Sequence, residues 1–346
     1  MTVRLADLAN AAELRRIDDY VAAHREAELF HRPQWSLAVE QGCRQRSHYL
    51  LGENRAGVVT GCLPLTEVRS PLFGDALVST GFGTGGGPLA DDAAIADSLV
   101  REGWAVAERL NCRSMELRGG AIPEGWTAQS GVYAGFSKPL PQGDEAILRA
   151  MKRRHRSIRR AREFDLEIRR GSSEADRAMH YAVYCEMVRN LGSPVFPRAL
   201  FSAMLDRFGA DADILTVLND GRPLASALTF YFRGTAMPYW GGGTAASRGF
   251  SATELMYYQV MCHAARRGCT TFDFGRSKVG AGSYSFKQNW GFEPRPLVYA
   301  VRATDGGRPR EVNPLAPKYR LQVAAWQRLP LWLANRLGPK IARGLG

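Results

Sequence analysis

The stretch Thr271–Phe292 reads TFDFGRSKVGAGSYSFKQNWGF and organises the expectations for the whole chain. Aromatic and polar residues alternate at its start, which predicts a buried strand. Gly275 is expected to end that strand. Polar side chains then follow at the C-terminal end of the strand, where open α/β sheets bind their ligands. They are Arg276, Ser277 and Lys278.

The second half of this stretch should return the chain to the same edge. Gly280 and Gly282 supply a pliable turn. Lys287 would then lie beside the end of the strand, with Trp290 and Phe292 as apolar anchors behind it.

A similar order of elements occurs twice in the chain: a strand hairpin, a strand, a glycine triplet, a helix and a strand. In the first copy 30 residues separate Gly86 from Glu116, and in the second copy 31 residues separate Gly242 from Asp273. Self-similarity over so long a period indicates a duplicated unit. The repeated order is that of a GNAT acyltransferase core, in which two neighbouring strands splay apart around an acyl donor.

The motifs FDFGRSK and FKQNWGF, with YWGGG upstream, resemble the FemA/FemB/FemX family of aminoacyl transferases. They are most similar to the FemAB-related subgroup found with exosortase and exopolysaccharide systems of Gram-negative bacteria. The resemblance implies an α/β fold of two tandem GNAT-like domains, each a mixed, mostly antiparallel sheet flanked by helices. We expect these domains at 1–142 and 143–312, followed by a basic amphipathic tail at 313–346. The resemblance also implies amide-bond formation on an amine of a cell-envelope precursor.

The composition indicates a compact and strongly basic protein. Among 346 residues, 46 are Lys or Arg and 34 are Asp or Glu, which gives a net charge of +12. This excess favours polyanionic partners such as RNA, nucleotide pyrophosphates or anionic lipid, and we expect no DNA partner. The six cysteines lack paired spacing, so we expect buried thiols and no metal site. Neither a signal peptide nor a membrane-spanning run is evident, which predicts a cytoplasmic protein.

A run of positive charge lies between the two copies. Seven of the thirteen residues from Met151 to Glu163 are Lys or Arg. On a helix, Leu148, Met151, His155, Ile158 and Ala161 would form an apolar stripe between two basic flanks. A charge run is usually a solvated face, but mutual repulsion favours an anionic ligand here. Arg156, Arg159 and Arg160 are the candidate contacts.

The tail interleaves apolar residues with cations. Basic amphipathic helices that contain tryptophan often lie on anionic membrane surfaces, which predicts a peripheral contact with the inner membrane. The alternative is packing on the first domain, as the resemblance to Fem proteins implies.

Transfer of an activated acyl group to an amine requires positioning, proton removal and stabilisation of a tetrahedral oxyanion. Asp273 is the candidate that holds the amine or relays its proton, with a structural strand-edge carboxylate as the alternative. Lys287, which matches the family's FK lysine, is the candidate for the oxyanion or a donor phosphate. Arg276 and Lys278 would bind phosphate of the acceptor. The remaining substrate-contact candidates are Ser277, Tyr239, Trp240, Gly241, Gly242 and Tyr284.

The identity of the donor separates the hypotheses. CoA-dependent GNATs carry Arg/Gln-x-x-Gly-x-Gly/Ala before the core helix, where main-chain N–H groups bind pyrophosphate. Residues 247–252 read SRGFSA and do not fit this pattern, which favours aminoacyl-tRNA over acyl-CoA. Either donor would be a substrate, not a permanently bound cofactor. Three hypotheses stay open: an aminoacyl-tRNA-dependent transferase acting on a phosphate-bearing envelope precursor, an acyl-CoA N-acyltransferase, and a non-catalytic module that binds envelope precursors or RNA.

Overall fold

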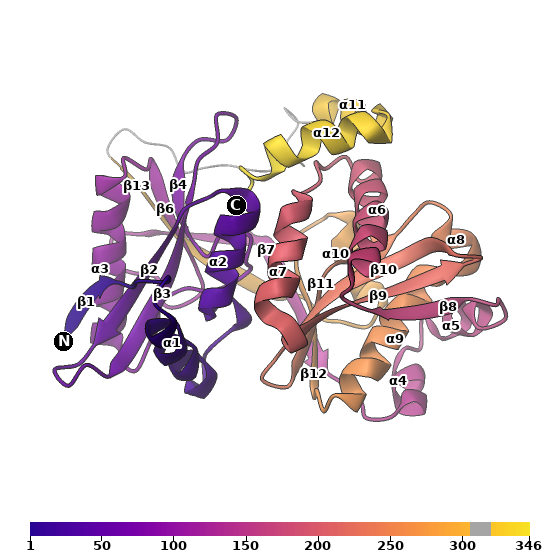
Figure 1. Cartoon of the computed structure of the whole chain (residues 1–346), viewed down its shortest axis with the longest axis horizontal. Coiled ribbons are helices and arrows are strands. Elements are labelled where there is room, and N and C mark those ends of the chain that lie inside the picture. The colour runs from indigo at the N-terminus through magenta and orange to yellow at the C-terminus, as the bar shows by residue number, and fades with distance from the viewer. Residues whose placement is uncertain (305–319) are drawn as a thin grey trace. The chain divides into compact units, whose positions relative to one another are not determined.

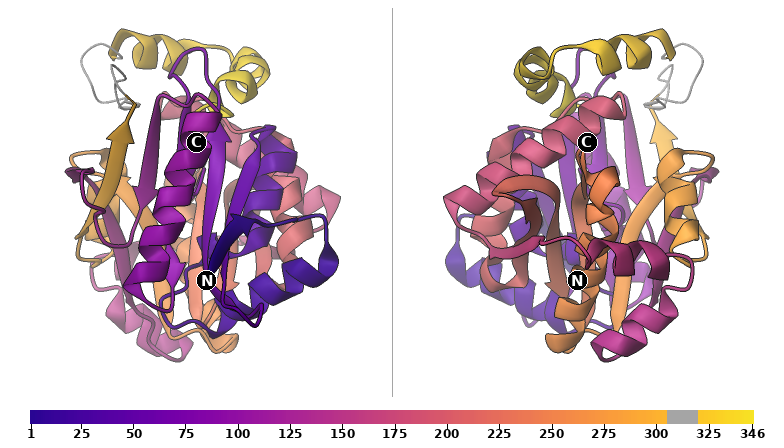
Figure 2. Two further views of the ribbon diagram at one scale, coloured as in Figure 1. Left: turned by 90° about the vertical axis from the view of Figure 1, so that its left-hand side faces the viewer. Right: turned by 90° about the vertical axis from the view of Figure 1, so that its right-hand side faces the viewer.

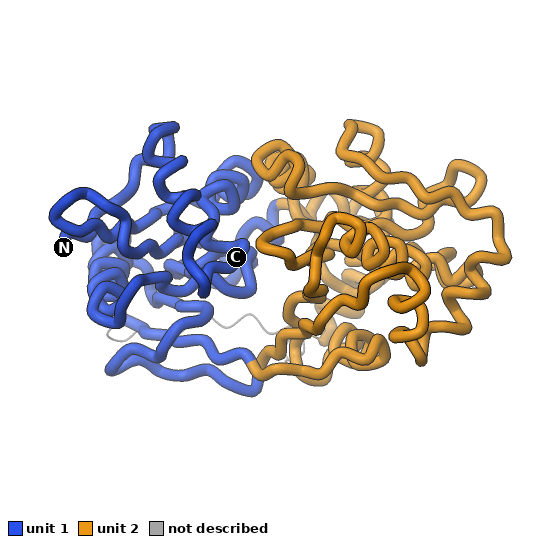
Figure 3. Tube along the Cα trace, turned by 90° about the horizontal axis from the view of Figure 1, so that it is seen from below, with its two compact units in different colours: residues 1–131, 297–313, 340–346 blue, residues 132–296, 314–339 orange. Residues whose placement is uncertain are grey.

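The computed structural model describes residues 1–304 and 320–346, which form two compact units (Figures 1 and 3). Unit 1 comprises Met1–Gly131, Leu297–Asn313 and Lys340–Gly346, and unit 2 comprises Val132–Pro296 and Pro314–Pro339. Unit 1 therefore ends earlier in the chain than the expected limit at residue 142, and it also includes two later segments.

Unit 1 has a mostly antiparallel sheet with the strand order β1-β2-β3-β4-β6-β13, and β5 pairs with β3. Strands β4 and β6 are parallel. The strands are β1 (Thr2–Leu5), β2 (Ser47–Glu53), β3 (Val59–Val68), β4 (Ala76–Ser79), β5 (Leu89–Ala90), β6 (Ser114–Arg118) and β13 (Arg295–Ala303). Helix α3 (Ala93–Arg109) covers one face of the sheet, and α1 (Ala11–Ala23) and α2 (Pro33–Cys43) cover the other (Figures 1 and 2). The Asp92 side chain caps α3 by accepting a hydrogen bond from the Ile95 N–H.

Unit 2 repeats this arrangement with the strand order β8-β9-β10-β11-β12-β7. Its strands are β7 (Thr127–Pro139), β8 (Glu167–Gly171), β9 (Ala212–Asn219), β10 (Arg222–Phe232), β11 (Thr235–Gly243) and β12 (Thr271–Lys278). Its helices are α4 (Asp144–Ala150), α5 (His155–Ala161), α6 (Glu174–Asn190), α7 (Arg198–Phe208), α8 (Ser247–Phe250), α9 (Ala252–Arg266), α10 (Gly282–Asn289), α11 (Arg320–Arg328) and α12 (Leu331–Ala342).

Consecutive residues of β10 show that helices cover both faces of this sheet. Phe230 packs on Phe208 of α7, and the next residue, Tyr231, packs on His263 of α9. Side chains alternate between the faces of a strand, so α7 and α9 lie on opposite faces. The larger core, between the sheet and α9, also receives buried residues of α4 and α5.

The duplicated architecture is confirmed by equal strand order, equal strand directions and two matching irregularities. Each hairpin has a bulge close to its turn. The two bulged residues, Thr60 and Leu224, accept main-chain hydrogen bonds from Asp91 and Thr244 respectively. The helix-to-strand corners match as well: the N–H groups of Cys112 and Cys269 donate to the carbonyls of Ala107 and Ala264. Glu116 therefore corresponds to Asp273, as expected.

The proposed alignment of the glycine triplets needs correction. Leu89 pairs with Cys62, and Gly242 pairs with Ser226, two residues beyond the bulged position in each unit. Leu89, not Gly86, is therefore the counterpart of Gly242. In unit 1 a loop separates β4 from β5, whereas in unit 2 the corresponding strand β11 is continuous and contains Gly241–Gly243. The second triplet is thus strand, not turn.

The last strand of each sheet comes from the chain that leaves the other unit. Strand β7 follows β6 in sequence but pairs with β12, and β13 follows β12 but pairs with β6. The local sequence pattern cannot reveal such an exchange, because it depends on pairing between distant segments.

Candidate active site

A bulge in β12 creates the candidate site. Asp273 pairs with Ser137 and Arg276 pairs with Gly135, so Phe274 and Gly275 both lie opposite a single residue of β7. Gly275 has φ of 65°, a conformation that glycine adopts without steric cost. The expectation that Gly275 ends the strand is therefore wrong: the chain bulges there, and β12 continues to Lys278.

Lys287 of α10 reaches this bulge, as expected from the turn before it. Its Nζ donates hydrogen bonds to the carbonyl oxygens of Arg276 at 2.8 Å and Gly275 at 3.3 Å. The same atom lies 5.4 Å from the ring centroid of Phe136. Burial lowers the pKa of Lys287 to about 7; the negative charge of Asp273 opposes this shift, and the charge of Arg276 adds to it.

Asp273 lies beside the bulge without a cationic partner at ion-pair distance in the part of the chain that is described. Its Oδ1 accepts a hydrogen bond of 2.6 Å from the Gly275 N–H. Burial raises the pKa of Asp273, and the Gly275 hydrogen bond and the charges of Lys287 and Arg295 oppose that shift. The pKa of the carboxyl group is raised and that of the lysine is lowered. Shifts in these directions are typical of side chains that transfer protons in active sites.

The polar residues after the bulge divide between the two faces of the sheet. Arg276 and Lys278 share the side of β12 that carries Tyr133. The guanidinium carbon of Arg276 lies 4.5 Å from the ring centroid of Tyr133, and the ammonium nitrogen of Lys278 lies 5.5 Å from it. Ser277 is buried on the other side, and its hydroxyl has no hydrogen-bond partner among the described residues. Arg276 and Lys278 therefore present cations together, whereas Ser277 is turned away from them.

Helix α10 is held by aromatic packing. Trp290 and Phe292 are almost fully buried, as predicted, and Phe286 and Trp290 both pack against Tyr257 of α9. Tyr284 packs edge-on against Phe136 at 5.2 Å between ring centroids. These contacts fix the backbone from which Lys287 projects.

Lys138 of β7 is a second buried lysine that the sequence analysis missed. Its Nζ donates to the Trp290 carbonyl at 3.1 Å and lies 4.2 Å from the ring centroid of Phe292. Burial lowers the pKa of Lys138 to about 8. Its contact with the C-terminal end of α10 stabilises that helix end. A charged residue within the strand pattern of residues 132–139 was the available signal.

The residues from Tyr239 to Gly242 serve packing within unit 2. Trp240 is buried against Phe201 and Phe230. A Cβ added to Gly242 would collide with the Met187 sulfur. Internal packing thus explains why glycine is needed there, and contact of this main chain with a donor stays a prediction.

The basic segment forms the turn and short helix from Met151 to Arg162. Leu148, Met151, Ile158 and Ala161 are buried, as the predicted stripe requires, and His155 is half-buried. The candidates Arg156, Arg159 and Arg160 are exposed. Arg160 donates to the Gly249 carbonyl, whereas Arg156 and Arg159 have no partner among the described residues.

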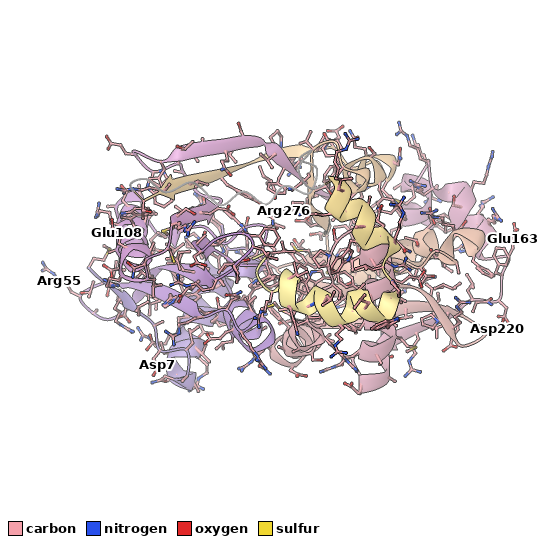
Figure 4. The ribbon with its side chains drawn as sticks, turned by 90° about the horizontal axis from the view of Figure 1, so that it is seen from above. Asp7, Arg55, Glu108, Glu163, Asp220 and Arg276 are labelled. Carbon is pink, nitrogen blue, oxygen red and sulfur yellow. The ribbon has the colours of Figure 1, made fainter. Side chains whose placement is uncertain are left out.

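The end of α5 and the bulge lie apart within unit 2 (Figure 4). Glu163, just after α5, and Arg276 lie at opposite ends of unit 2. Asp273, Arg276, Lys278 and Lys287 gather at the bulge, whereas the end of α5 forms a separate basic surface.

Two kinds of feature are absent from the described residues. No group of three or more His, Cys, Asp or Glu side chains there could hold a metal ion. No described helix combines the length and apolar character needed to cross a membrane. All six cysteines are buried and unpaired.

Residues 147–288 match the family described as an acetyltransferase (GNAT) domain. No curated protein matches the chain. Among solved structures, FemX aligns with a TM-score of 0.66 and 13% identity, covering 88% of this chain and 98% of that one. The C-terminal domain of a putative lysylphosphatidylglycerol synthetase from Agrobacterium fabrum aligns with a TM-score of 0.56 and 15% identity, covering 86% and 93% respectively. A tandem GNAT protein from the clavulanic acid biosynthesis pathway aligns with a TM-score of 0.54 and 12% identity, covering 87% and 98%.

These comparisons confirm two predictions. The fold is a tandem GNAT arrangement of mixed sheets flanked by helices. The chain is an acyltransferase, since residues 147–288 match an acetyltransferase (GNAT) domain.

Proposed function

We propose that this acyltransferase moves an aminoacyl group from tRNA to an amine of a phosphate-bearing cell-envelope precursor, with its active centre at the β12 bulge. One observation carries the proposal: a buried lysine donates to two main-chain carbonyls of the bulge, next to a carboxylate without an ion-pair partner among the described residues. Burial of a lysine and a carboxylate costs stability, so an arrangement of this kind points to chemistry.

The residues can divide the steps of acyl transfer between them. The amine attacks the ester carbonyl, the C–N bond forms, and negative charge develops on the carbonyl oxygen. Asp273 would accept the proton that the amine loses and then pass it to the departing ribose oxygen as the C–O bond breaks. Lys287 as an ammonium has three N–H groups, of which two bond to Gly275 and Arg276. Its third N–H would stabilise the oxyanion.

Arg276 and Lys278 would bind the phosphate group of the acceptor. Both cations lie on the side of β12 that carries Tyr133, and Arg276 follows the bulge directly. Arginine and lysine together suit a phosphate or diphosphate group. The likeness to FemX and to a lysylphosphatidylglycerol synthetase domain supports an envelope acceptor.

Acyl-CoA is the second candidate donor, because the matched family is described as an acetyltransferase domain. The start of α9 does not favour it. The Ser247 hydroxyl donates to the Thr244 carbonyl, and Glu254 brings a carboxylate into the first turn of α9, where it pairs with Arg154 at 3.4 Å. A carboxylate near a helix N-terminus competes with a pyrophosphate for the same positive potential. The adjacent basic segment suits an RNA better.

The donor experiment uses the full-length protein with a small amine acceptor. One reaction contains aminoacyl-tRNA and the other acetyl-CoA, and mass spectrometry detects the acylated acceptor. We expect product with the tRNA donor and its loss in Lys287→Met. Product from acetyl-CoA alone would replace the tRNA proposal by the second candidate, and absence of product with both donors would count against both.

A further inference from the structure

Helices α11 and α12 form a basic helical pair whose inner side is attached to unit 2 (Figures 1 and 4). Val323 of α11 fills the space beside Gly192, and Arg189 donates to the Gln327 carbonyl at 3.1 Å. Gly338 of α12 packs against Val195. The inner side is therefore occupied by the end of α6 and the segment after it.

The outer side of the pair is exposed and apolar. Leu321 is 85% exposed and Trp332 is 67% exposed, among the highest values for large apolar side chains in the described chain. Buried packing would normally cover such residues, and an exposed leucine together with an exposed tryptophan marks a contact surface. Tryptophan is also the residue that prefers the boundary between lipid and water.

Positive charge accompanies these apolar residues. Trp332, Arg336 and Lys340 follow one another at intervals of four on α12, so they share one helical face. On α11, Leu321 and Arg328 are seven residues apart and likewise share a face. The sequence from residue 320 to residue 346 contains five Lys or Arg and no Asp or Glu.

We infer that the outer side of α11 and α12 binds the surface of an anionic phospholipid membrane. Two short helices that present leucine, tryptophan and only positive charge match the chemistry of that surface, whereas a protein partner would provide carboxylates for some of the cations and an RNA would leave Leu321 in water. Packing on the first domain was the alternative expected for the tail from its sequence. That alternative needs correction, because the inner side of the pair packs on unit 2, and in the described part of the tail only Lys340–Gly346 belongs to unit 1. This inference rests on α11 and α12 alone and not on the proposed transfer reaction.

The test is cosedimentation of the full-length protein with vesicles of phosphatidylcholine, with or without phosphatidylglycerol. We expect binding only to vesicles that contain phosphatidylglycerol, and binding should weaken as salt is added. Removing two cations in Arg328→Gln/Arg336→Gln should lower the partition coefficient by roughly 30-fold, since each cation near such a surface contributes about fivefold. Removing the apolar contacts in Leu321→Ala/Trp332→Ala should lower it by at least tenfold.

Two matched controls use residues elsewhere. Leu72→Ala removes another exposed leucine, and Arg156→Gln/Arg159→Gln removes two exposed cations from the basic segment. Both controls should bind vesicles as the unchanged protein does, and all variants should keep its melting temperature. Equal binding to neutral vesicles, or equal losses in the controls, would overturn the inference. A change of mass in light scattering for Leu321→Ala/Trp332→Ala, with vesicle binding unchanged, would make the outer side a contact between two copies and would also overturn it.

The membrane inference and the proposed function are tested by separate measurements, so either can be overturned without the other. Leu321→Ala/Trp332→Ala should leave turnover of a small soluble amine unchanged, because both side chains are exposed and α11 packs on α6. Loss of vesicle binding with normal turnover supports the membrane surface. Absent turnover in all variants would count against the proposed function only.

Discussion

Strand β6 of unit 1 and strand β12 of unit 2 occupy the same place in the duplicated sheet, yet their polar residues are arranged differently. Strand β6 pairs regularly with β13 through Glu116, Leu117 and Arg118. Glu116 forms an ion pair of 2.7 Å with Arg118, which is only 4% exposed. Arg118 also donates to the carbonyls of Thr80, Gly83 and Gly346. Every charge on β6 is therefore neutralised by local partners.

Strand β12 has one residue more than regular pairing allows. The extra residue creates the bulge, and the carbonyls of Gly275 and Arg276 turn to Lys287. Asp273, the counterpart of Glu116, bonds to a main-chain N–H in place of an arginine. The comparison teaches that one extra residue can replace an ion pair between side chains by hydrogen bonds of a lysine and a carboxylate to the main chain of a bulge.

Exchanging the two carboxylates for amides should separate their roles most clearly. In Asp273→Asn we expect turnover to fall by about 10²–10⁴, the contribution of a general base. Its pKa is raised in the folded protein, so the ionised form lowers stability at neutral pH, and the variant should keep or raise the melting temperature. Glu116→Gln should leave turnover unchanged and lower the melting temperature, because it leaves the buried Arg118 without its charge partner.

Turnover and thermal unfolding measured on both variants decide this prediction. A normal turnover for Asp273→Asn, with a lowered melting temperature, would make Asp273 a structural carboxylate like Glu116.

Lys287→Met tests the cation of the bulge. Methionine keeps most of the aliphatic stem within the aromatic cluster and removes the donor, so folding should persist. Turnover should fall by roughly 10²–10³, the usual effect of losing one oxyanion donor. The control is Arg222→Met, which removes an exposed cation at the β9–β10 hairpin of unit 2. Equal turnover in Lys287→Met and Arg222→Met would remove Lys287 from the proposed mechanism.

The pH dependence should show which form of Lys287 acts. Its folded pKa is about 7, below the ordinary value of 10.5. If the ammonium stabilises the oxyanion, the ratio of turnover between the unchanged protein and Lys287→Met is constant below pH 7 and falls about tenfold per pH unit above it. A ratio that rises through pH 7 would instead make the neutral amine a base.

Stability gives an independent check of the same pKa. The unfolded chain binds more protons at Lys287 between pH 7 and 10.5, so this residue destabilises the fold most below pH 7, and the penalty disappears as pH approaches 10.5. The advantage of Lys287→Met in melting temperature should therefore be largest below pH 7 and shrink at higher pH.

The sequence predicted much of this site because its signals are local. The alternation at Thr271–Phe274, the glycines of the following turn and the aromatic anchors were sufficient to bring Lys287 near Gly275. The duplication was visible because both copies keep the same order of hairpin, helix and strand. These features depend on residues close together in the chain.

The features that the sequence did not predict depend on pairing partners. A glycine with positive φ can end a strand or bulge within it, and only the register with β7 shows which occurs at Gly275. The exchange of β7 and β13 between the sheets, and with it Lys138 beside α10, requires contacts between distant segments. The role of Gly242 became clear only from the position of Met187.

The smallest effect is expected from alanine substitution of two glycines, Gly275 in the bulge and Gly119, which follows β6. Both have positive φ, and an added Cβ would meet no other atom. Alanine at either position must adopt a left-handed conformation, which costs about 1–2 kcal/mol of stability. Both variants should therefore lose a similar amount in chemical denaturation. Only Gly275→Ala should also change turnover, because strain there would shift the carbonyl that accepts from Lys287 and the N–H that donates to Asp273. We expect a several-fold loss of turnover per folded molecule there and none in Gly119→Ala. If both variants lose stability equally and turn over normally, the bulge serves only to shape the sheet, and the difference between β6 and β12 has no part in catalysis.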